Sequence, residues 1–263
     1  MNEQSGTQAA RRPQPEVLAL DFADLGAALT SGLADFRKAP LYGLFFGGVF
    51  AAGGLLALAF LTWFGELWLI IPIGIGFPLI GPFAAAGLYE VSRRLEAGEE
   101  LTWSGVLVFV FRQREGQLGW MAFVVLFVFW IWLYQIRILI ALFLGFKSPS
   151  TIGGFVKVVT TSQEGLMFLG VGTAVGAVLA AALFSITVIA MPLLIDSQRD
   201  FVTAMITSVK TVARNPAVML VWALFVMALA FIALAPLFVG LLVIFPVLGH
   251  ASWHLYRRAI RGA

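Results

Sequence analysis

The only two histidines of the chain, His250 and His254, stand four residues apart. On a helix this spacing places both imidazoles on one face, with their Cβ atoms roughly 5–6 Å apart. Such a pair could ligate a metal ion or haem iron, or pass a proton from one ring to the other. A structural metal site usually has four ligands, and Glu90 is one conceivable third. The alternative is that both histidines hydrogen-bond to backbone groups or lipid headgroups at the membrane interface, so no cofactor is predicted.

A second candidate is Arg137, which lies with Tyr134 and Gln135 inside a long apolar stretch. A charge near the middle of a bilayer costs on the order of 2.5–3.5 kcal/mol, so it normally has a partner or a role. Three explanations are open. Arg137 could extend along its aliphatic stem to the outer interface, or bond to a carbonyl of a neighbouring helix. With Gln135, it could also contact an anionic substrate or a lipid phosphate.

Two apolar segments are interrupted by proline and glycine at similar places. These residues free backbone carbonyls, which must be satisfied inside the protein or by water. In transporters, paired interrupted spans of this kind surround a binding site near the bilayer midplane. The alternative is that the kinks only shape helix packing. The residues are Pro72, Pro78, Gly81 and Pro82 in the first segment, and Pro246 and Gly249 in the second.

Small residues recur at intervals of four in two other segments. Gly172, Gly176 and Ala180 form one stripe, and Gly43 with Gly47 forms a shorter one. Small residues at this spacing let helix backbones approach closely in a membrane, where lipid provides no hydrophobic drive for association. The stripes therefore predict close helix packing, either within the molecule or against a partner or second copy.

Hydrophobic helices must position all of these residues. Hydrophobic residues make up 60% of the 263 residues and charged residues only 12%, with a mean hydropathy of +0.95. A soluble domain contains about 45–50% apolar and about 25% charged residues, and a span needs about 20 apolar residues. The sequence therefore predicts an all-α polytopic membrane protein of six transmembrane helices. The spans lie at about 41–63, 67–89, 117–145, 166–194, 217–237 and 238–256.

The basic residues predict the topology. Most of the 17 Lys and Arg residues fall on one side of this six-span arrangement, whereas Lys147 and Lys157 fall on the other. Cytoplasmic loops carry such an excess of positive charge, so both termini are expected in the cytoplasm. The net charge of +3 then indicates contact with anionic lipid headgroups rather than a nucleic-acid partner.

The domain organisation is simple. Residues 1–20 contain no apolar run and predict a flexible cytoplasmic tail, and residues 21–263 predict one transmembrane domain. Within that domain, the parts at about 21–95 and 199–260 resemble each other. Each begins with an amphipathic helix expected at the cytoplasmic interface and continues through a proline into a span and then an interrupted span. A weaker third copy would include Trp103 and Leu107.

Several function classes are excluded by what the sequence lacks. The chain has no cysteine, so disulfides and thiolate metal sites are impossible. It contains no P-loop and no HExxH motif, and no membrane-facing Ser, His and Asp set is evident. The short loops leave no room for a soluble catalytic domain.

Residues 81–94, 191–196 and 249–257 together resemble an uncharacterised bacterial family of integral membrane proteins, catalogued as a domain of unknown function. Some members of that family carry a cytochrome c oxidase subunit label. The resemblance implies a bacterial inner-membrane protein and supplies no catalytic residues. Because a haem-copper catalytic subunit needs at least six ligating histidines, the chain could only be an accessory subunit or assembly partner of such a complex.

These observations favour a non-enzymatic accessory or scaffold protein of the inner membrane. We expect it to be associated with a respiratory complex, and either to bind another membrane protein or to form a homo-oligomer. A small permease or lipid-handling protein is the alternative, based on the interrupted spans and Arg137. A redox protein that binds haem or metal through His250 and His254 is the third.

Overall fold

The computed structural model describes residues 15–63, 70–113, 116–145, 152–197 and 199–262. These residues are helical apart from short connections and two strands of two residues each, which confirms the all-α class. The helices are α1 (Phe22–Lys38), α2 (Pro40–Trp63), α3 (Ile70–Ala97), α4 (Trp103–Gln113), α5 (Gln117–Leu139), the π-helix η2 (Ile140–Leu144), α6 (Ile152–Thr161), α7 (Gln163–Thr187), α8 (Ala190–Asp196), α9 (Phe201–Arg214), α10 (Pro216–Leu234) and α11 (Leu241–Ala259).

Among the described residues, three helical segments are long and apolar enough to cross a membrane. They are α5 with η2, α7 with α8, and α10, which match the third, fourth and fifth predicted spans. A fourth is obtained if α1 and the first part of α2, which meet at 103°, are treated as one bent span. The protein therefore has the helices of a membrane protein, and the count of six spans stays a prediction.

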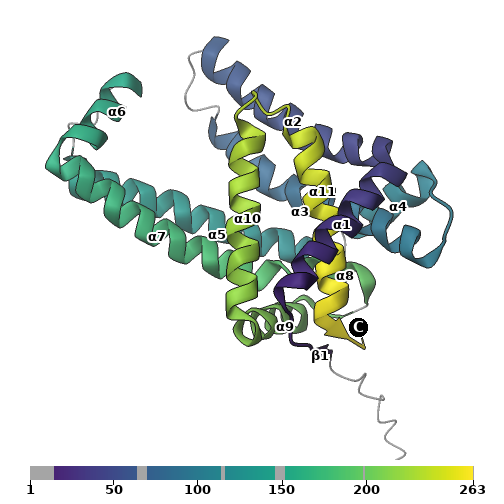
Figure 1. Ribbon diagram of the computed structural model, residues 1–263. Helices are drawn as coiled ribbons and strands as arrows, with labels where there is room; N and C mark the ends of the chain where they lie inside the picture. Colours follow the sequence, from purple (N-terminus) through teal and green to yellow (C-terminus); the bar gives the residue numbers. More distant parts are fainter. Residues whose placement is uncertain (1–14, 64–69, 114–115, 146–151, 198, 263) are drawn as a thin grey trace, which may run out of the picture.

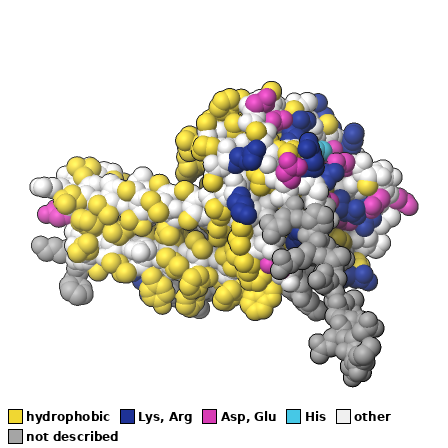
Figure 2. Space-filling view, turned by 90° about the horizontal axis from the view of Figure 1, so that it is seen from below, with side chains coloured by type: hydrophobic (Ala, Val, Ile, Leu, Met, Phe, Trp, Pro, Cys, Tyr) yellow, Lys and Arg dark blue, Asp and Glu magenta, His cyan; other side chains and the backbone are white. Residues whose placement is uncertain are grey.

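The helices form a body and an arm (Figure 1). The arm consists of α5 and α7 lying side by side, with α6 at its far end, and it projects sideways from the body. In the same view α10 and α11 stand upright in the body, so the long apolar helices do not share one direction. Hydrophobic side chains cover the arm, and charged side chains gather on the body (Figure 2).

The most extensive helix contact joins α1 to α11, although the two helices lie at opposite ends of the chain. Gly32 makes this contact possible, because a Cβ atom at this position would lie 2.5 Å from the backbone nitrogen of Ala251. The predicted interfacial helix thus turns Leu25, Ala28 and Gly32 toward the protein and leaves Phe22 exposed. The two backbones touch, as expected where glycine lies at a helix crossing.

The α2 helix packs beside α1 on α11, again through glycine. A Cβ at Gly47 would lie 2.9 Å from Cγ of Pro246 and 3.0 Å from the carbonyl oxygen of Leu241. A Cβ at Gly43 would meet the ring of Phe36 at 2.5 Å and Pro246 at 3.3 Å. The shorter of the two small-residue stripes therefore faces the inside of the molecule.

The α9 helix buries small polar residues and exposes part of its apolar residues. Thr207, Ser208 and Thr211 are buried, and the Ser208 hydroxyl accepts a hydrogen bond from the backbone nitrogen of Ile189 at 3.1 Å. Val202 and Ile206 are exposed on the opposite face. This orientation suits a helix that lies against a membrane surface.

Residues 15–20 are bound to the other end of the chain, which corrects the expectation of a flexible tail reaching to residue 20. Strand β1 (Glu16–Val17) pairs antiparallel with β2 (Ile260–Arg261). The Leu20 backbone nitrogen then donates to Oδ1 of Asn215 at 2.8 Å, and Nδ2 of Asn215 donates to the carbonyl of Leu18 at 3.0 Å. Backbone pairing explains the order here, because this segment has no apolar run of its own. Residues 1–14 lie outside the described residues.

The interrupted spans are also corrected. Helix α3 runs continuously through Pro72, Pro78 and Pro82, and α11 runs continuously through Pro246. A proline removes one backbone hydrogen bond from a helix, which a membrane helix tolerates when its neighbours hold it in place. The apolar helices are interrupted elsewhere, at the π-helix after α5 and between α7 and α8.

The two predicted repeat units share the geometry of one junction. Ala39, before Pro40, has φ −132° and ψ 55°, and Asn215, before Pro216, has φ −125° and ψ 53°. When α9 is aligned with α1 so that Asn215 matches Ala39, the two helices bury the same positions. The matched buried residues are Ala28 and Ala204, Gly32 and Ser208, Asp35 and Thr211, and Ala39 and Asn215. The repeat itself stays a prediction.

We expect Gly32→Leu to lower the apparent unfolding temperature of the detergent-purified protein, because the new side chain meets the α11 backbone. Overpacking of this kind costs about 1–3 kcal/mol or more. Gly26→Leu is the matched control, since no described atom lies within 4 Å of a Cβ at Gly26 and leucine favours the helix. An equal loss of stability in both variants would contradict the close crossing.

Candidate functional site: a buried polar network at the α1–α3–α11 junction

Both histidines belong to a buried polar network that consists of Asp35, Ser92, His250 and His254. The Ser92 hydroxyl lies 2.8 Å from Oδ2 of Asp35 and 2.8 Å from Nδ1 of His250. Nε2 of His254 lies 2.7 Å from the same Oδ2 of Asp35. The i, i+4 spacing thus does place both imidazoles on one face of α11, where they meet α1 and α3.

Three helices bring these side chains together. Asp35 comes from the last turns of α1, Ser92 from the second half of α3, and the histidines from α11. Two glycines allow the approach, namely Gly32 against Ala251 and Gly249, where a Cβ would lie 2.6 Å from Cδ1 of Leu88. Ser92 and His250 are fully buried, whereas His254 keeps about a fifth of its side chain exposed.

The charge on Asp35 fixes the direction of the hydrogen bonds. Burial would raise the pKa of Asp35, but the hydrogen bonds from His254 and Ser92 outweigh it and lower the pKa below its ordinary value. Asp35 is therefore ionised and can only accept, so Ser92 donates its one proton to Asp35. Nδ1 of His250 must then carry a proton and donate it to the Ser92 oxygen.

This arrangement does not activate a nucleophile. A catalytic serine gives its proton to a histidine, whereas Ser92 gives its proton to a carboxylate and accepts one from His250. The nitrogens are also engaged in ways that do not suit a shared metal ion, because Nδ1 of His250 faces Ser92 and Nε2 of His254 faces Asp35. In the described part of the chain, no group of three or more His, Cys, Asp or Glu residues could hold a metal ion.

One atom of the network lacks a partner. Nε2 of His250 is buried and makes no hydrogen bond within the described residues. If the ring is neutral with its proton on Nδ1, this nitrogen presents a lone pair to the interior. The backbone of Leu88 is close to the ring, but no hydrogen bond of acceptable geometry joins the two. A single buried lone pair can accept a proton or a water molecule.

Glu90, the third ligand considered from sequence, belongs to a different cluster. Its buried carboxylate accepts from Nε of Arg93 at 2.8 Å and from Nε of Arg94 at 2.6 Å. Arg93 also pairs with Glu99 at 2.9 Å. Glu90 is therefore the counter-ion of two arginines and is not directed to the histidines.

Ionic contacts surround the network at the same end of the body. Arg257 pairs with Glu96 and with Asp196, each at 3.1 Å. The Tyr256 hydroxyl donates to Asp196 at 2.7 Å, and the Trp253 indole donates to Glu96 at 2.9 Å. These contacts join α11 to α3 and α8, so the polar end of α11 is held by protein groups.

Arg137 and Gln135 lie far from this network, on the arm. Arg137 is exposed near the end of α5 and lines a small depression of about 190 Å³ with Ile140 and Gly145. Gln135 lines a separate groove of about 430 Å³ between α5 and α7. The structure therefore places these two neighbours in sequence on different surfaces.

The second small-residue stripe also lies on the arm. Gly172 and Gly176 line the same groove as Gln135, and Ala180 is exposed. A Cβ at Gly172 would have Leu139 at 3.8 Å, and one at Gly176 would have no described atom within 4 Å. Unlike Gly43 and Gly47, whose added Cβ atoms would meet neighbours at 2.5 Å and 2.9 Å, these residues have no described atom closer than 3.8 Å to an added Cβ.

The other residues marked in sequence lie in the body. Pro246 packs against Gly43 and Gly47, and Gly249 against Leu88. Gly81 lines a cavity beside α10. The side chains of Pro72, Pro78 and Pro82 lie outside those that the structure describes.

Sequence reasoning missed Asp35 and Ser92. Asp35 carried a usable signal, because it continues the buried positions Leu25, Ala28 and Gly32 at helical spacing, where an acid is out of place. Ser92 carried none, since a serine beside Arg93 and Arg94 is typical of a solvated helix end. Its contact with His250 spans 158 residues of sequence.

We expect Asp35→Asn to destabilise the protein by about 1–3 kcal/mol, because it removes the shared acceptor of Ser92 and His254 while keeping the side-chain size. The apparent unfolding temperature in detergent measures this. Glu16→Gln is the control, since it removes an equal charge from an exposed pair with Arg261 at 3.7 Å. A similar shift in both variants would refute a special role for Asp35.

Stability should also depend on pH through Asp35. Because its folded-state pKa lies below the unfolded value of about 3.9, ionised Asp35 stabilises the fold fully above that value. That contribution is lost as the pH falls through the unfolded and then the folded pKa. Melting curves recorded from neutral to acidic pH should show a smaller acid loss for Asp35→Asn than for the wild type. An identical acid loss would contradict the assignment.

The comparisons with known proteins agree with a membrane protein. Residues 69–196, from α3 to the end of α8, match the family of predicted integral membrane proteins DUF2189. No curated protein and no solved structure matches the chain. The prediction of an uncharacterised membrane-protein family is confirmed, and the match carries no cytochrome oxidase label. With its apolar helices and this match, the chain is an integral membrane protein whose residues 69–196 are similar to the DUF2189 family.

Proposed function

We propose that this protein is a non-enzymatic accessory or scaffold protein of the bacterial inner membrane, and that its arm binds a transmembrane helix of another membrane protein. One observation carries the proposal. The groove of about 430 Å³ between α5 and α7 is lined by Gly172, Thr173 and Gly176 on one side and by Trp132 and Gln135 on the other.

The groove has the features of a helix-binding surface. Glycines let a second backbone approach closely, and a polar group such as Gln135 can hydrogen-bond across the contact. The arm also exposes large apolar side chains at helical spacing, including Phe123, Phe127 and Trp130 on α5. Lipid can cover these side chains, but it does not fill a groove shaped by glycine as closely as a packed helix does.

The ends of the chain support the predicted topology. The pairing of β1 with β2 holds Glu16 beside Arg261, so both lie on one side of the membrane and the helices between them cross it an even number of times. Arg93, Arg257 and Arg258 gather at the same end of the body. This supports a cytoplasmic location for that end.

The two alternatives receive less support from the geometry. A permease built on Arg137 and the proline-containing helices would need them at one site, whereas Arg137 lies on the arm and Pro246 in the body. A redox protein that uses both histidines would need free nitrogens that converge, whereas Nδ1 of His250 faces Ser92 and Nε2 of His254 faces Asp35, which leaves Nε2 of His250 without a hydrogen bond among the described residues.

The proposal is tested by gentle-detergent purification of the tagged protein from native membranes, with mass spectrometry and an absorption spectrum on one fraction. We expect a stoichiometric membrane-protein partner, and respiratory subunits among the partners would extend the proposal to a respiratory complex. A colourless protein that purifies alone as a monomer would overturn it, and a homodimer would assign the groove to a second copy.

We expect Gly176→Leu to reduce the recovered partner at least tenfold, because the leucine would project into the groove, where no described atom lies within 4 Å of a Cβ at this position. Gly170→Leu is the matched control, since Gly170 is equally open but lies on another face of α7. Equal partner recovery with both variants would show that the groove is not the binding surface.

A further inference from the structure

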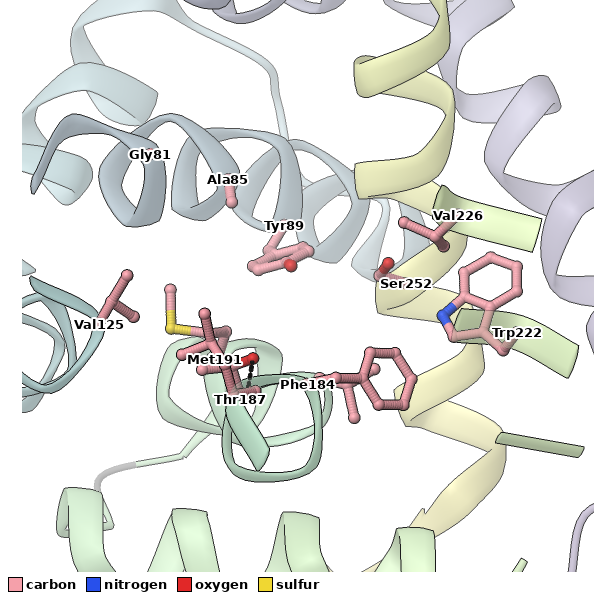
Figure 3. Close-up of a pocket in the computed structure, with 12 residues that line it drawn as sticks. Gly81, Ala85, Tyr89, Val125, Phe184, Thr187, Met191, Trp222, Val226 and Ser252 are labelled. Carbon is pink, nitrogen blue, oxygen red and sulfur yellow. Dashed lines mark hydrogen bonds between the residues drawn. The ribbon is translucent and has the colours of Figure 1, made fainter. Parts of the chain in front are cut away.

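An open cavity of about 350 Å³ lies on the body, where α10 faces the junction of α7 and α8 (Figure 3). It exists because α10 packs on α11 but makes no comparable contact with α7 or α8 among the described residues. We call it the α10 cavity. Its lining comes from α3, α5, α7, α8, α10 and α11 and is mostly apolar, including Ala85, Val125, Phe184, Val188, Met191 and Val226.

Two hydrogen-bond donors in this cavity have no partner among the described residues. Tyr89 is 7% exposed and Trp222 is 1% exposed, and both line the cavity. Neither the Tyr89 hydroxyl nor the Trp222 indole nitrogen makes a hydrogen bond with any described residue. In Figure 3, Tyr89 extends from α3 toward Met191, and the indole nitrogen of Trp222 is on the side of Phe184 and Ser252. Tyr and Trp donors normally have a hydrogen-bond partner, and both atoms here can be reached from the cavity, so a molecule bound in it can supply the acceptor.

The remaining polar groups define the chemistry of that acceptor. The Thr187 hydroxyl donates to the carbonyl of Leu183 at 2.7 Å, and the Ser252 hydroxyl donates to the carbonyl of Leu248 at 2.8 Å. Their protons are used inside their own helices. Of the described residues that line the cavity, none carries a charge. An anionic headgroup would therefore be buried without compensation, whereas a neutral oxygen acceptor attached to hydrocarbon fits.

The cavity also lies at a suitable depth. Trp222 is six residues after Pro216, so it lies roughly 9 Å along α10 from the start of that helix. If α10 begins at the edge of the hydrocarbon core, Trp222 lies in the third of the core nearest the headgroups. The volume lies at the lower end of the range for ligand pockets, about 300–1,000 Å³, which suits one chain or ring rather than a whole diacyl lipid.

We propose that the α10 cavity binds a neutral, hydrocarbon-rich molecule from the bilayer, whose carbonyl oxygens accept hydrogen bonds from Tyr89 and Trp222. Acyl esters of lipids and quinones both supply this chemistry. The site is independent of the arm groove, so it does not rest on the accessory function.

The purified full-length protein in detergent tests the proposal, with the methyl ester of a doxyl-labelled stearic acid as the probe. Electron paramagnetic resonance measures the immobilised fraction of the probe. We expect saturable binding to the wild type and a loss of affinity of about tenfold in the variant Tyr89→Phe with Trp222→Phe, the change expected from one to two hydrogen bonds. The control carries the same substitutions at Tyr134 and Trp130, which are exposed on α5, and should bind as the wild type does.

A second variant keeps the test usable if the double variant is too unstable. Ala85→Leu fills the cavity from α3 and should abolish binding even where the double variant melts too early to be used. Displacement of the probe by decyl-substituted benzoquinone but not by unlabelled methyl stearate assigns the site to quinones, and the reverse assigns it to acyl esters. Equal binding by wild type, double variant and Ala85→Leu overturns the proposal. The proposal is also overturned if neither the doxyl-labelled ester nor the decyl-substituted benzoquinone binds saturably to the wild type, which would leave only water in the cavity.

Discussion

The arrangement of the body depends on one close contact, the crossing of α1 and α11 at Gly32 and Ala251. Because the backbones touch there, Asp35, about one turn further along α1, reaches His254 and Ser92 at hydrogen-bond distance. A side chain at position 32 would separate the helices and leave the charge of Asp35 and the protonated nitrogen of His250 buried without partners. The cost of an unpaired buried charge makes this crossing a strong constraint on the register of both helices.

The same crossing makes α11 the centre of the body. Its second half is covered by α1, α3 and α8, and Trp253, Leu255 and Tyr256 are fully buried. A helix with two histidines and two arginines in its last turns would be costly to expose to lipid. Here protein groups satisfy these side chains, so the polar half of α11 is stable whether it lies within the membrane or at its cytoplasmic surface. This is why hydropathy alone does not settle whether α11 is a span.

Sequence patterns predicted what is local. The all-α class and the α5, α7 and α10 helices follow from runs of apolar residues, and the positions of Pro40 and Pro216 marked where α2 and α10 begin. Contacts between distant parts of the chain were not predictable in this way. Nothing near Ser92 indicates His250, and nothing near Glu16 indicates Ile260, because such pairs depend on how helices cross. The prolines of α3 failed as markers for a related reason, since neighbouring helices decide whether a proline ends a helix.

Polar groups that have hydrogen-bond partners lie in the stable parts of the molecule, and the parts that are open to ligands contain polar groups without a partner among the described residues. In the network, three helices meet closely and one acceptor, Nε2 of His250, lacks a partner; a single lone pair in a site without further room gives a ligand little to hold. In the α10 cavity, the Tyr89 hydroxyl and the Trp222 indole have no hydrogen bond to a described residue, and the space beside them is open. In the arm, no described atom lies within 4 Å of a Cβ at Gly176. Binding energy is available where packing is incomplete, so the two incompletely packed surfaces, rather than the histidine pair, are where this protein is suited to meet other molecules.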